Sequence, residues 1–138
     1  MYNIYTDGAY SHLMDKGGYA YIILKDDAIL CEGSGHYDHT TNNQMELMAI
    51  IKALSRIKES SDITVFSDSQ YVISIATGKA SIRKNKLLWN IYFNYAQKHN
   101  INYIHIKGHS GNKYNEWCDR LATQNGNITD NKQRGCIS

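Results

Sequence analysis

Thr41-Asn42-Asn43-Gln44-Met45-Glu46-Leu47-Met48-Ala49 is the stretch from which the fold can be worked out. Its polar amides give way to apolar residues that recur at helical spacing, which predicts a loop followed by an amphipathic helix over about 43–58. Thr41 or Asn42 is the expected N-cap of that helix. Glu46 falls in the first turn among apolar neighbours, so we expect a buried carboxylate. A buried acid is more useful to chemistry than to solubility.

Short runs rich in tyrosine, isoleucine and leucine flank this stretch and are typical of strands. The first three predict an antiparallel meander with a hairpin at Asp26-Asp27. The later strands alternate with helices, which predicts strands parallel to the first. The fold class is therefore α/β, with a mixed five-stranded sheet of three antiparallel strands followed by two parallel ones, flanked by helices. The expected strands span 2–6, 18–25, 28–33, 63–67 and 101–106, and the expected helices span 43–58, a brief segment that ends at Gly78, 88–95 and 112–124.

Length and composition fit a single domain. The chain has 138 residues, of which 42% are hydrophobic, enough for one buried core. We expect the domain to span 1–124, and we expect 125–138, which is polar and without periodicity, to be a loosely held tail. No stretch approaches the roughly 20 apolar residues that span a membrane, and three widely spaced cysteines suggest no disulfide framework. These features predict a cytoplasmic protein that makes no contact with a membrane.

Three further acids lie at the ends of predicted elements and share the setting of Glu46. Asp7 occurs in Thr6-Asp7-Gly8, Asp68 follows a short strand, and Asp119 lies in the last helix. Ligand sites in such sheets lie beyond the C-terminal ends of parallel strands, where Asp7 and Asp68 are expected. Four carboxylates in that setting predict a divalent metal site. Taken singly, each acid is more typical of a turn or a helix end, and Asp68 could cap the helix behind it.

The net charge leaves two interpretations open. The formal value is +2 at pH 7, even though four acids are assigned to one site. An acidic pocket within a basic surface suits a metal site that receives a polyanion. A solvated mixture of charges accounts for the same value.

Four ordered blocks of sequence resemble those of type 1 ribonuclease H. The resemblance implies the ribonuclease H-like fold and an endonuclease that hydrolyses the RNA strand of an RNA/DNA hybrid. It implies a two-metal-ion mechanism that leaves 5′-phosphate and 3′-hydroxyl ends, with two Mg²⁺ ions per site and Mn²⁺ as a substitute. The blocks are Thr6-Asp7-Gly8; Thr41-Asn42-Asn43 with Met45-Glu46-Leu47; Asp68-Ser69-Gln70-Tyr71-Val72; and Lys107-Gly108-His109-Ser110-Gly111 leading to Asn115 and Asp119-Arg120-Leu121-Ala122.

The resemblance also implies a catalytic role for each acid and for one histidine. Asp7 would bridge the two ions, and Asp119 would hold the ion that activates water. Glu46 and Asp68 would hold the ion at the leaving 3′ oxygen. His109, on a glycine-flanked loop, resembles a residue that assists proton transfer or product release.

Five polar side chains resemble residues that bind the hybrid. Asn42, Asn43 and Gln70 match amides that reach the minor groove, where 2′-hydroxyls distinguish RNA from DNA. Thr41 matches a hydroxyl that helps seat a phosphate of the DNA strand, and Asn115 matches a supportive amide near the fourth acid. The expected partner is thus an RNA/DNA hybrid, with a replication protein as a further partner, and the chain is expected to act as a monomer.

Three departures from the family pattern concern hybrid affinity. The loop at 10–17 lacks the Asn-Pro-Gly element that many relatives use near the RNA strand. Only about ten residues, 77–86, stand where many relatives insert a basic helix and loop. We also expect no separate hybrid-binding domain before Met1. We therefore expect weaker hybrid binding and steep inhibition by salt. The cations expected to carry this binding are Lys79, Arg83, Lys84 and Lys86.

Two alternative functions remain open. The chain could be a broader ribonuclease that also cuts double-stranded RNA, because two-metal chemistry does not itself choose the strand. It could also be a non-cleaving module that binds hybrids. Four intact acids argue against the second alternative, because a buried carboxylate cluster repels phosphate and would not help a pure binder.

Overall fold

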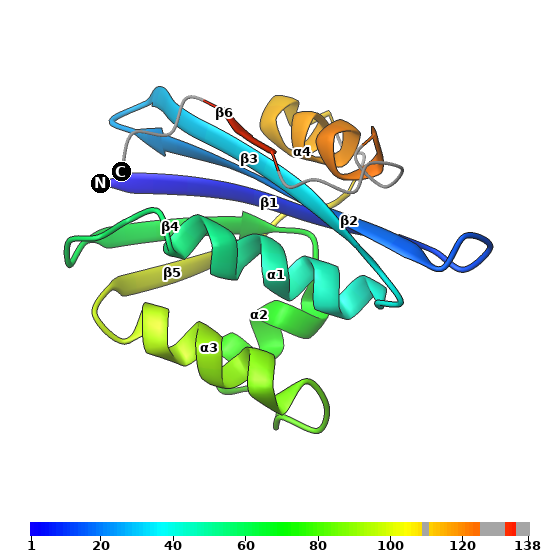
Figure 1. Ribbon diagram of the computed structural model, residues 1–138. Coiled ribbons are helices and arrows are strands. Elements are labelled where there is room, and N and C mark those ends of the chain that lie inside the picture. The colour runs from blue at the N-terminus through cyan, green and yellow to red at the C-terminus, as the bar shows by residue number, and fades with distance from the viewer. Residues whose placement is uncertain (109–110, 125–131, 135–138) are drawn as a thin grey trace.

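A mixed sheet with helices on both faces makes up the protein (Figure 1). The computed structural model describes residues 1–108, 111–124 and 132–134. The strands are β1 (Tyr2–Ser11), β2 (Lys16–Lys25), β3 (Ala28–Asp38), β4 (Asp62–Ser67), β5 (Asn100–His105) and β6 (Lys132–Arg134), and the helices are α1 (Asn42–Leu54), α2 (Gln70–Ala76), α3 (Lys86–Ala96) and α4 (Lys113–Gln124). Helix α4 covers one face of the sheet, and α1, α2 and α3 lie on the other.

The strand order is β5-β4-β1-β2-β3-β6. Strands β1, β2 and β3 form the antiparallel meander, β4 pairs parallel to β1, and β5 pairs parallel to β4. The predicted five-stranded arrangement is therefore confirmed. Strand β6 was not predicted: it pairs antiparallel to β3 within the segment expected to be a loose tail. Three residues without an apolar alternation carry no strand signal, because their pairing depends on the exposed edge of β3.

The helix that follows Thr41 begins as predicted. Thr41 is the N-cap of α1, and its hydroxyl accepts a hydrogen bond from the Gln44 N–H at 3.1 Å. Because the helix starts at Asn42, Glu46 lies in the second turn rather than the expected first, yet it is only 4% exposed. The helix ends at Leu54, before the predicted end near 58.

Asp68 could have capped the helix behind it, but the structure shows a different residue as the cap. Ser69 is the N-cap of α2, and its hydroxyl accepts a hydrogen bond from the Val72 N–H at 3.2 Å. Asp68 is therefore not needed as a cap. Its side chain lies directly after the C-terminal end of the strand.

Apolar cores on both faces of the sheet hold the layers together. The larger core lies between the sheet and α1, α2 and α3, and Trp89 of α3 is fully buried in it. A smaller core lies under α4, where Cys118 and Ala122 pack against β2. Burial of these side chains fixes α1 and α4 on opposite faces of β1, the strand that carries Asp7. No helix in the described ranges is both long and apolar enough to cross a membrane.

The cysteines differ from the expectation at one position. Cys118 is a free, buried thiol, but Cys31 in β3 is disulfide-bonded. The expectation of no disulfide is therefore wrong for Cys31. Sequence spacing could not reveal this bond, because a disulfide depends on which residues the fold brings within reach.

Candidate active site

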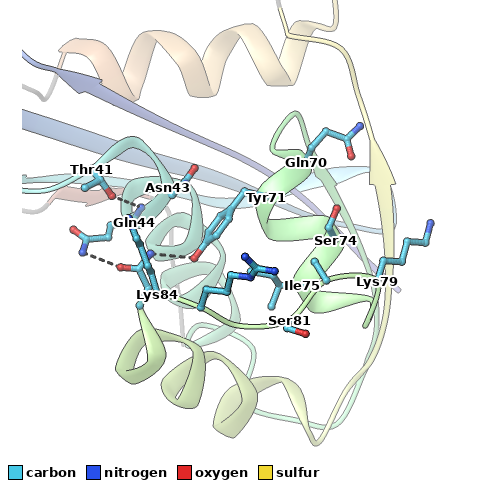
Figure 2. Close-up of a pocket in the computed structure, with 13 residues that line it drawn as sticks. Thr41, Asn43, Gln44, Gln70, Tyr71, Ser74, Ile75, Lys79, Ser81 and Lys84 are labelled. Carbon is cyan, nitrogen blue, oxygen red and sulfur yellow. Dashed lines mark hydrogen bonds between the residues drawn. The ribbon is translucent and has the colours of Figure 1, made fainter.

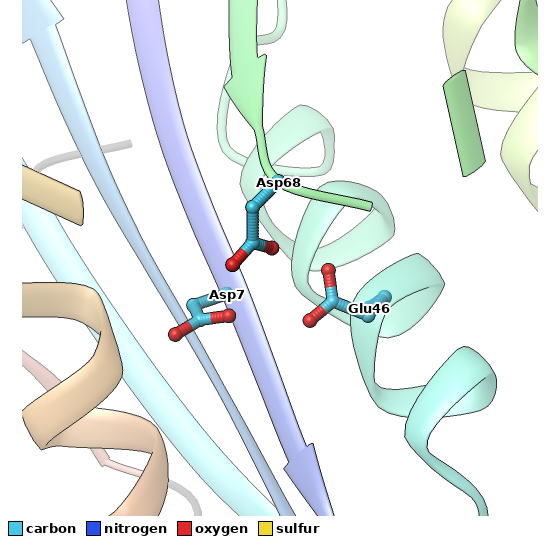
Figure 3. Close-up of side chains that lie close together, drawn as sticks. All are labelled: Asp7, Glu46 and Asp68. Carbon is cyan, nitrogen blue, oxygen red and sulfur yellow. The ribbon is translucent and has the colours of Figure 1, made fainter. Parts of the chain in front are cut away.

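Three carboxylates meet where β1, the end of β4 and α1 come together (Figure 3). Asp7 lies in β1, Asp68 directly follows β4, and Glu46 lies in α1. The parallel register pairs Tyr5 with Phe66, so Asp7 and Asp68 each stand two residues further along neighbouring strands. One oxygen from each of the three acids lies within 4.8 Å of the other two. The predicted grouping of these three residues is thus present in the fold.

A glycine allows α1 to approach β1 closely enough to complete the cluster. A Cβ atom at Gly8 would lie 2.5 Å from the backbone nitrogen of Glu46, a distance that real structures do not tolerate. The Gly8 N–H donates to Glu46 Oε1 at 2.8 Å and to Asp7 Oδ1 at 2.9 Å. Gly8 therefore both admits the helix and orients two of the three carboxylates.

Burial raises the pKa of two carboxyl groups in the cluster, so the fully ionised cluster is unfavourable. Burial, followed by the neighbouring charge of Asp68, raises the pKa of the Asp7 carboxyl from 3.8 to about 7. Burial, together with the charges of Asp7 and Asp68, raises the pKa of Glu46 well above its ordinary value. Without a cation, the cluster therefore retains protons near neutral pH.

The donor atoms of the cluster fit a divalent cation. Glu46 Oε2 is buried and has no hydrogen-bond partner within the described ranges, and an orphaned buried oxygen is unfavourable unless something binds it. Hard cations such as Mg²⁺ prefer carboxylate oxygens and would offset the mutual repulsion of the three acids. The residues at this position therefore fit the group that the sequence predicted.

The fourth predicted acid lies near the cluster but outside its closest group. Asp119 is half-buried on α4, and its negative charge is among the causes that raise the pKa of Asp7. It is not part of the set whose oxygens lie within 4.8 Å of one another. Asp119 thus lies on α4, which covers the face of the sheet opposite to α1 (Figure 1), near enough for its charge to influence Asp7.

The remaining catalytic prediction, His109, lies outside the described residues. Its neighbour Gly108 is described: a Cβ atom there would lie 2.8 Å from Asp68 Oδ2. The segment that leads to His109 therefore passes directly beside the cluster.

The amide of Asn115 on α4 is only 2% exposed, and its Nδ2 has no partner among the residues described.

A groove of about 1000 Å³ lies between the start of α1, α2 and the segment before α3 (Figure 2). Thr41, Asn43 and Gln70, all predicted to bind substrate, line it. Asn42 is exposed in the first turn of α1 but is not among the lining residues. Three of the four predicted cations line the groove, and Lys86 does not; the lining cations are Lys79, Arg83 and Lys84.

Hydrogen bonds join three residues of the groove that were not predicted to belong to the site. Gln44 Nε2 donates to Asn85 Oδ1 at 3.0 Å, and Asn85 Nδ2 donates to the Tyr71 hydroxyl at 3.0 Å. The Tyr71 hydroxyl also accepts from Trp89 Nε1 at 3.0 Å. The one sequence signal available was Asn85 at the start of an apolar helical pattern, which indicates a cap and not a bond across a groove.

The fold and the cluster together define a class of protein, an α/β domain with a carboxylate site suited to divalent cations and a basic groove beside it. Comparison with known proteins narrows the class. The model of the RNase H family matches residues 1–127. The chain belongs to the RNase H family.

Curated relatives and solved structures agree with this assignment. Ribonuclease HI of Synechocystis sp. is 37% identical, and the match covers 92% of this chain and 91% of the relative. Ribonuclease H of Caldanaerobacter subterraneus subsp. tengcongensis is 39% identical, over 88% of each chain. The structure of LC11-RNase H1 in complex with an RNA/DNA hybrid superposes with a TM-score of 0.79 at 21% identity, over 91% of this chain and 96% of that one. The fold is thus the ribonuclease H fold that the sequence predicted.

Proposed function

We propose that the protein is an endonuclease that hydrolyses the RNA strand of RNA/DNA hybrids and leaves 5′-phosphate and 3′-hydroxyl ends. The observation that carries the proposal is the convergence of Asp7, Glu46 and Asp68 beside a groove lined by cations and amides. The hybrid bound to LC11-RNase H1 supports the choice of substrate. Relatives over nearly the full chain that are named ribonuclease H support the choice of reaction.

The proposed cofactors are two Mg²⁺ ions per site, with Mn²⁺ as a substitute. Asp7, Glu46, Asp68 and Asp119 would hold them, with Asp7 between the two. When bound, such ions supply activation of water and stabilisation of the leaving oxygen. The chain itself contributes rigid placement, because Gly8 orients the carboxylates of Asp7 and Glu46 before any cation arrives.

His109 would take part in proton transfer or product release. The support for this role is its sequence context and the close approach of its neighbour Gly108 to Asp68, where an added Cβ atom would lie 2.8 Å from Asp68 Oδ2. An imidazole is suited to proton transfer near neutral pH. Loss of His109 would slow turnover and leave cation binding intact.

The groove would hold the nucleic acid. Thr41, Asn43 and Gln70 would contact the backbone and the 2′-hydroxyls, and Asn42 would reach the substrate from the exposed first turn of α1. Asn115 would act differently, since its burial points to support of Asp119 on the same helix. Lys79, Arg83 and Lys84 line the groove and would neutralise phosphates.

The protein would act as a monomer in the cytoplasm, where a replication protein could bring it to its substrate. Residues 1–124 would form the catalytic domain, with 125–138 as an appended segment. The support for a monomer is that residues of a single chain build the carboxylate cluster. Size-exclusion chromatography with light scattering tests the monomer, and fluorescence microscopy of a tagged chain tests the location.

One cleavage experiment separates the proposed function from its alternatives. End-labelled RNA is offered as an RNA/DNA hybrid, as double-stranded RNA and as a single strand, beside a labelled DNA duplex, each with Mg²⁺ and with EDTA. Cutting confined to the RNA of the hybrid and abolished by EDTA is the expected result. Cutting of double-stranded RNA would indicate a broader ribonuclease, and hybrid binding without cleavage in Mg²⁺ or Mn²⁺ would indicate a recognition module.

A further inference from the structure

A chain of side-chain hydrogen bonds crosses the groove from α1 to α2 (Figure 2). The Thr40 hydroxyl donates to Gln44 Oε1 at 2.9 Å, and Gln44 Nε2 donates to Asn85 Oδ1 at 3.0 Å. Asn85 Nδ2 then reaches the Tyr71 hydroxyl at 3.0 Å. The three groups Gln44, Asn85 and Tyr71, hereafter the Gln44–Asn85–Tyr71 bridge, come from three separate elements. They therefore link the two walls of the groove.

The side chain of Asn85 takes part in this bridge and does not cap α3. It is the N-cap residue of α3, yet its side chain makes no cap hydrogen bond. Its backbone lies in the left-handed region, with φ 62°, which asparagine tolerates better than most residues. An asparagine before a helix normally bonds the free N–H groups of the first turn. Here its amide bonds Gln44 and Tyr71 instead.

The bridge fixes one end of the basic segment that lines the groove. At the other end of this segment, the N–H groups of Lys79 and Ala80 both donate to the Ser74 carbonyl, at 2.8 and 3.0 Å. Arg83 and Lys84 lie between these two anchors and are exposed. Their positions relative to α1 consequently depend on the bond between Gln44 and Asn85.

Gln44 is engaged by protein at both ends of its amide. Its oxygen accepts from Thr40, its nitrogen donates to Asn85, and its side chain is half-buried. A carboxamide in this state is poorly placed to bind a ligand directly. Its effect on a ligand would pass through Asn85.

We infer that Gln44 is a positioning residue for nucleic-acid binding, which acts by holding Asn85 and the Arg83-Lys84 segment against α1. The inference rests on the proposed function, since it concerns how the same groove binds a hybrid. Gln44 governs affinity and not the chemical step, because it lies on the groove side of α1 and bonds none of the acids. Its influence depends on the presence of the Asn85 amide.

A double-mutant cycle tests the inference through KM, kcat and direct binding. The variants are Gln44→Leu, which keeps size and removes the amide, Asn85→Ala, and the two combined. Gln44→Leu should raise KM about 3- to 10-fold, the usual worth of one net hydrogen bond, with kcat within about twofold. In the Asn85→Ala background, Gln44→Leu should have almost no further effect on KM, because Gln44 then has no Asn85 amide to hold. Equal effects in both backgrounds would overturn the inference, as would an unchanged KM.

Controls separate this inference from protein folding and from the proposed function. Gln97→Leu is the matched control, because Gln97 is an exposed C-cap of α3 away from the groove, and its KM should not change. Far-UV circular dichroism and melting temperatures report folding; if Gln44→Leu does not fold, Tyr71→Phe breaks the far end of the bridge and should raise KM. Anisotropy of a labelled hybrid in EDTA measures affinity without cleavage. Wild-type binding without cutting would refute the proposed reaction and still allow the cycle to be measured, whereas no wild-type binding would overturn both.

Discussion

The acidic cluster and the basic wall of the groove are held by different kinds of structure. Asp7 and Glu46 lie within a strand and a helix, and Asp68 directly follows a strand. Arg83 and Lys84 lie in a segment without regular structure, anchored by Ser74 at one end and by the Gln44–Asn85–Tyr71 bridge at the other. The carboxylates are buried or half-buried, whereas the cations are exposed.

This difference indicates a division of labour. Hydrolysis needs oxygens fixed within a fraction of an ångström, and regular elements with a buried core supply that precision. Backbone binding needs charge near phosphates and tolerates movement. Changes in the cluster should therefore act on kcat and on stability, whereas changes in the basic wall should act on KM and on the response to salt.

The largest expected effect comes from neutralising an acid of the cluster. Asp68→Asn should reduce hybrid cleavage about a thousandfold or more, because one ligand of the proposed metal centre is lost, while hybrid binding in EDTA should persist. Asp62→Asn is the matched control, since Asp62 is exposed at the other end of the same strand. Equal activity of the two variants in a gel assay would contradict the catalytic role of the cluster.

The second-largest expected effect is a gain in folding stability when the buried charge of Asp7 is removed. The raised pKa of Asp7, about 7 against 3.8, means that the folded state holds its proton more tightly than the unfolded state. Stability of the cation-free protein should therefore fall as pH rises from about 4 through 7. In EDTA at pH 8, Asp7→Asn should be more stable by on the order of 3 kcal/mol, seen as a higher midpoint in urea.

The pH dependence of that gain provides its own control. Near pH 4 Asp7 is protonated in the folded state, so the variant and the wild type should have similar midpoints. The exposed Asp62→Asn should change stability little at either pH. If Asp7→Asn were less stable than the wild type at pH 8, the Asp7 carboxylate would be stabilising the fold. That result would refute the expected cost of its buried charge.

The third effect concerns the basic wall. Arg83→Ala combined with Lys84→Ala should raise KM about 10- to 30-fold and make binding less dependent on salt, as expected for two lost phosphate contacts, with kcat nearly unchanged. Lys58→Ala is a suitable control, because Lys58 is exposed beyond the end of α1 and does not line the groove. A fall in kcat at saturating hybrid would break the proposed division of labour.

The smallest effect is the coupling of cation binding to protons. Because the pKa of Asp7 is about 7 and that of Glu46 is also raised, a cation that binds must displace protons near neutral pH. Apparent Mg²⁺ affinity should rise up to about tenfold between pH 6 and pH 8. Calorimetry in buffers of different ionisation enthalpy measures the protons released. Binding that is independent of pH and of buffer would contradict the raised pKa values.

Most of the fold could be predicted because its signals are local. The apolar periodicity after Asn43 predicts α1, and the Asp26-Asp27 turn predicts the hairpin between β2 and β3. Both of these aspartates have positive φ, as a tight hairpin requires. The pairing of β1 with β4 follows from the alternation of strands and helices. Strand β6 could not be predicted, because it depends on a contact between segments far apart in sequence. The disulfide of Cys31 could not be predicted either, since cysteine spacing does not show which residues the fold brings within reach.

The candidate site could be predicted to the same extent. Acids at strand ends and in the α1 pattern predict the grouping of Asp7, Glu46 and Asp68, and the resemblance to a known family predicts their chemistry. The bridge through Gln44 and Asn85 could not be predicted, since two amides separated by 41 residues carry no pattern that pairs them. Side-chain bonds across a groove become visible only once the backbone is placed.

Anomalous scattering from Mn²⁺ in crystals of the protein tests the central claim most directly. The account predicts a Mn²⁺ peak bounded by the carboxylates of Asp7, Glu46 and Asp68, and a second peak between Asp7 and Asp119 when a hybrid is bound. Asp68→Asn crystals should lose or weaken the first peak. Absence of Mn²⁺ from the three carboxylates at millimolar concentration, with a hybrid in the groove, would contradict the account.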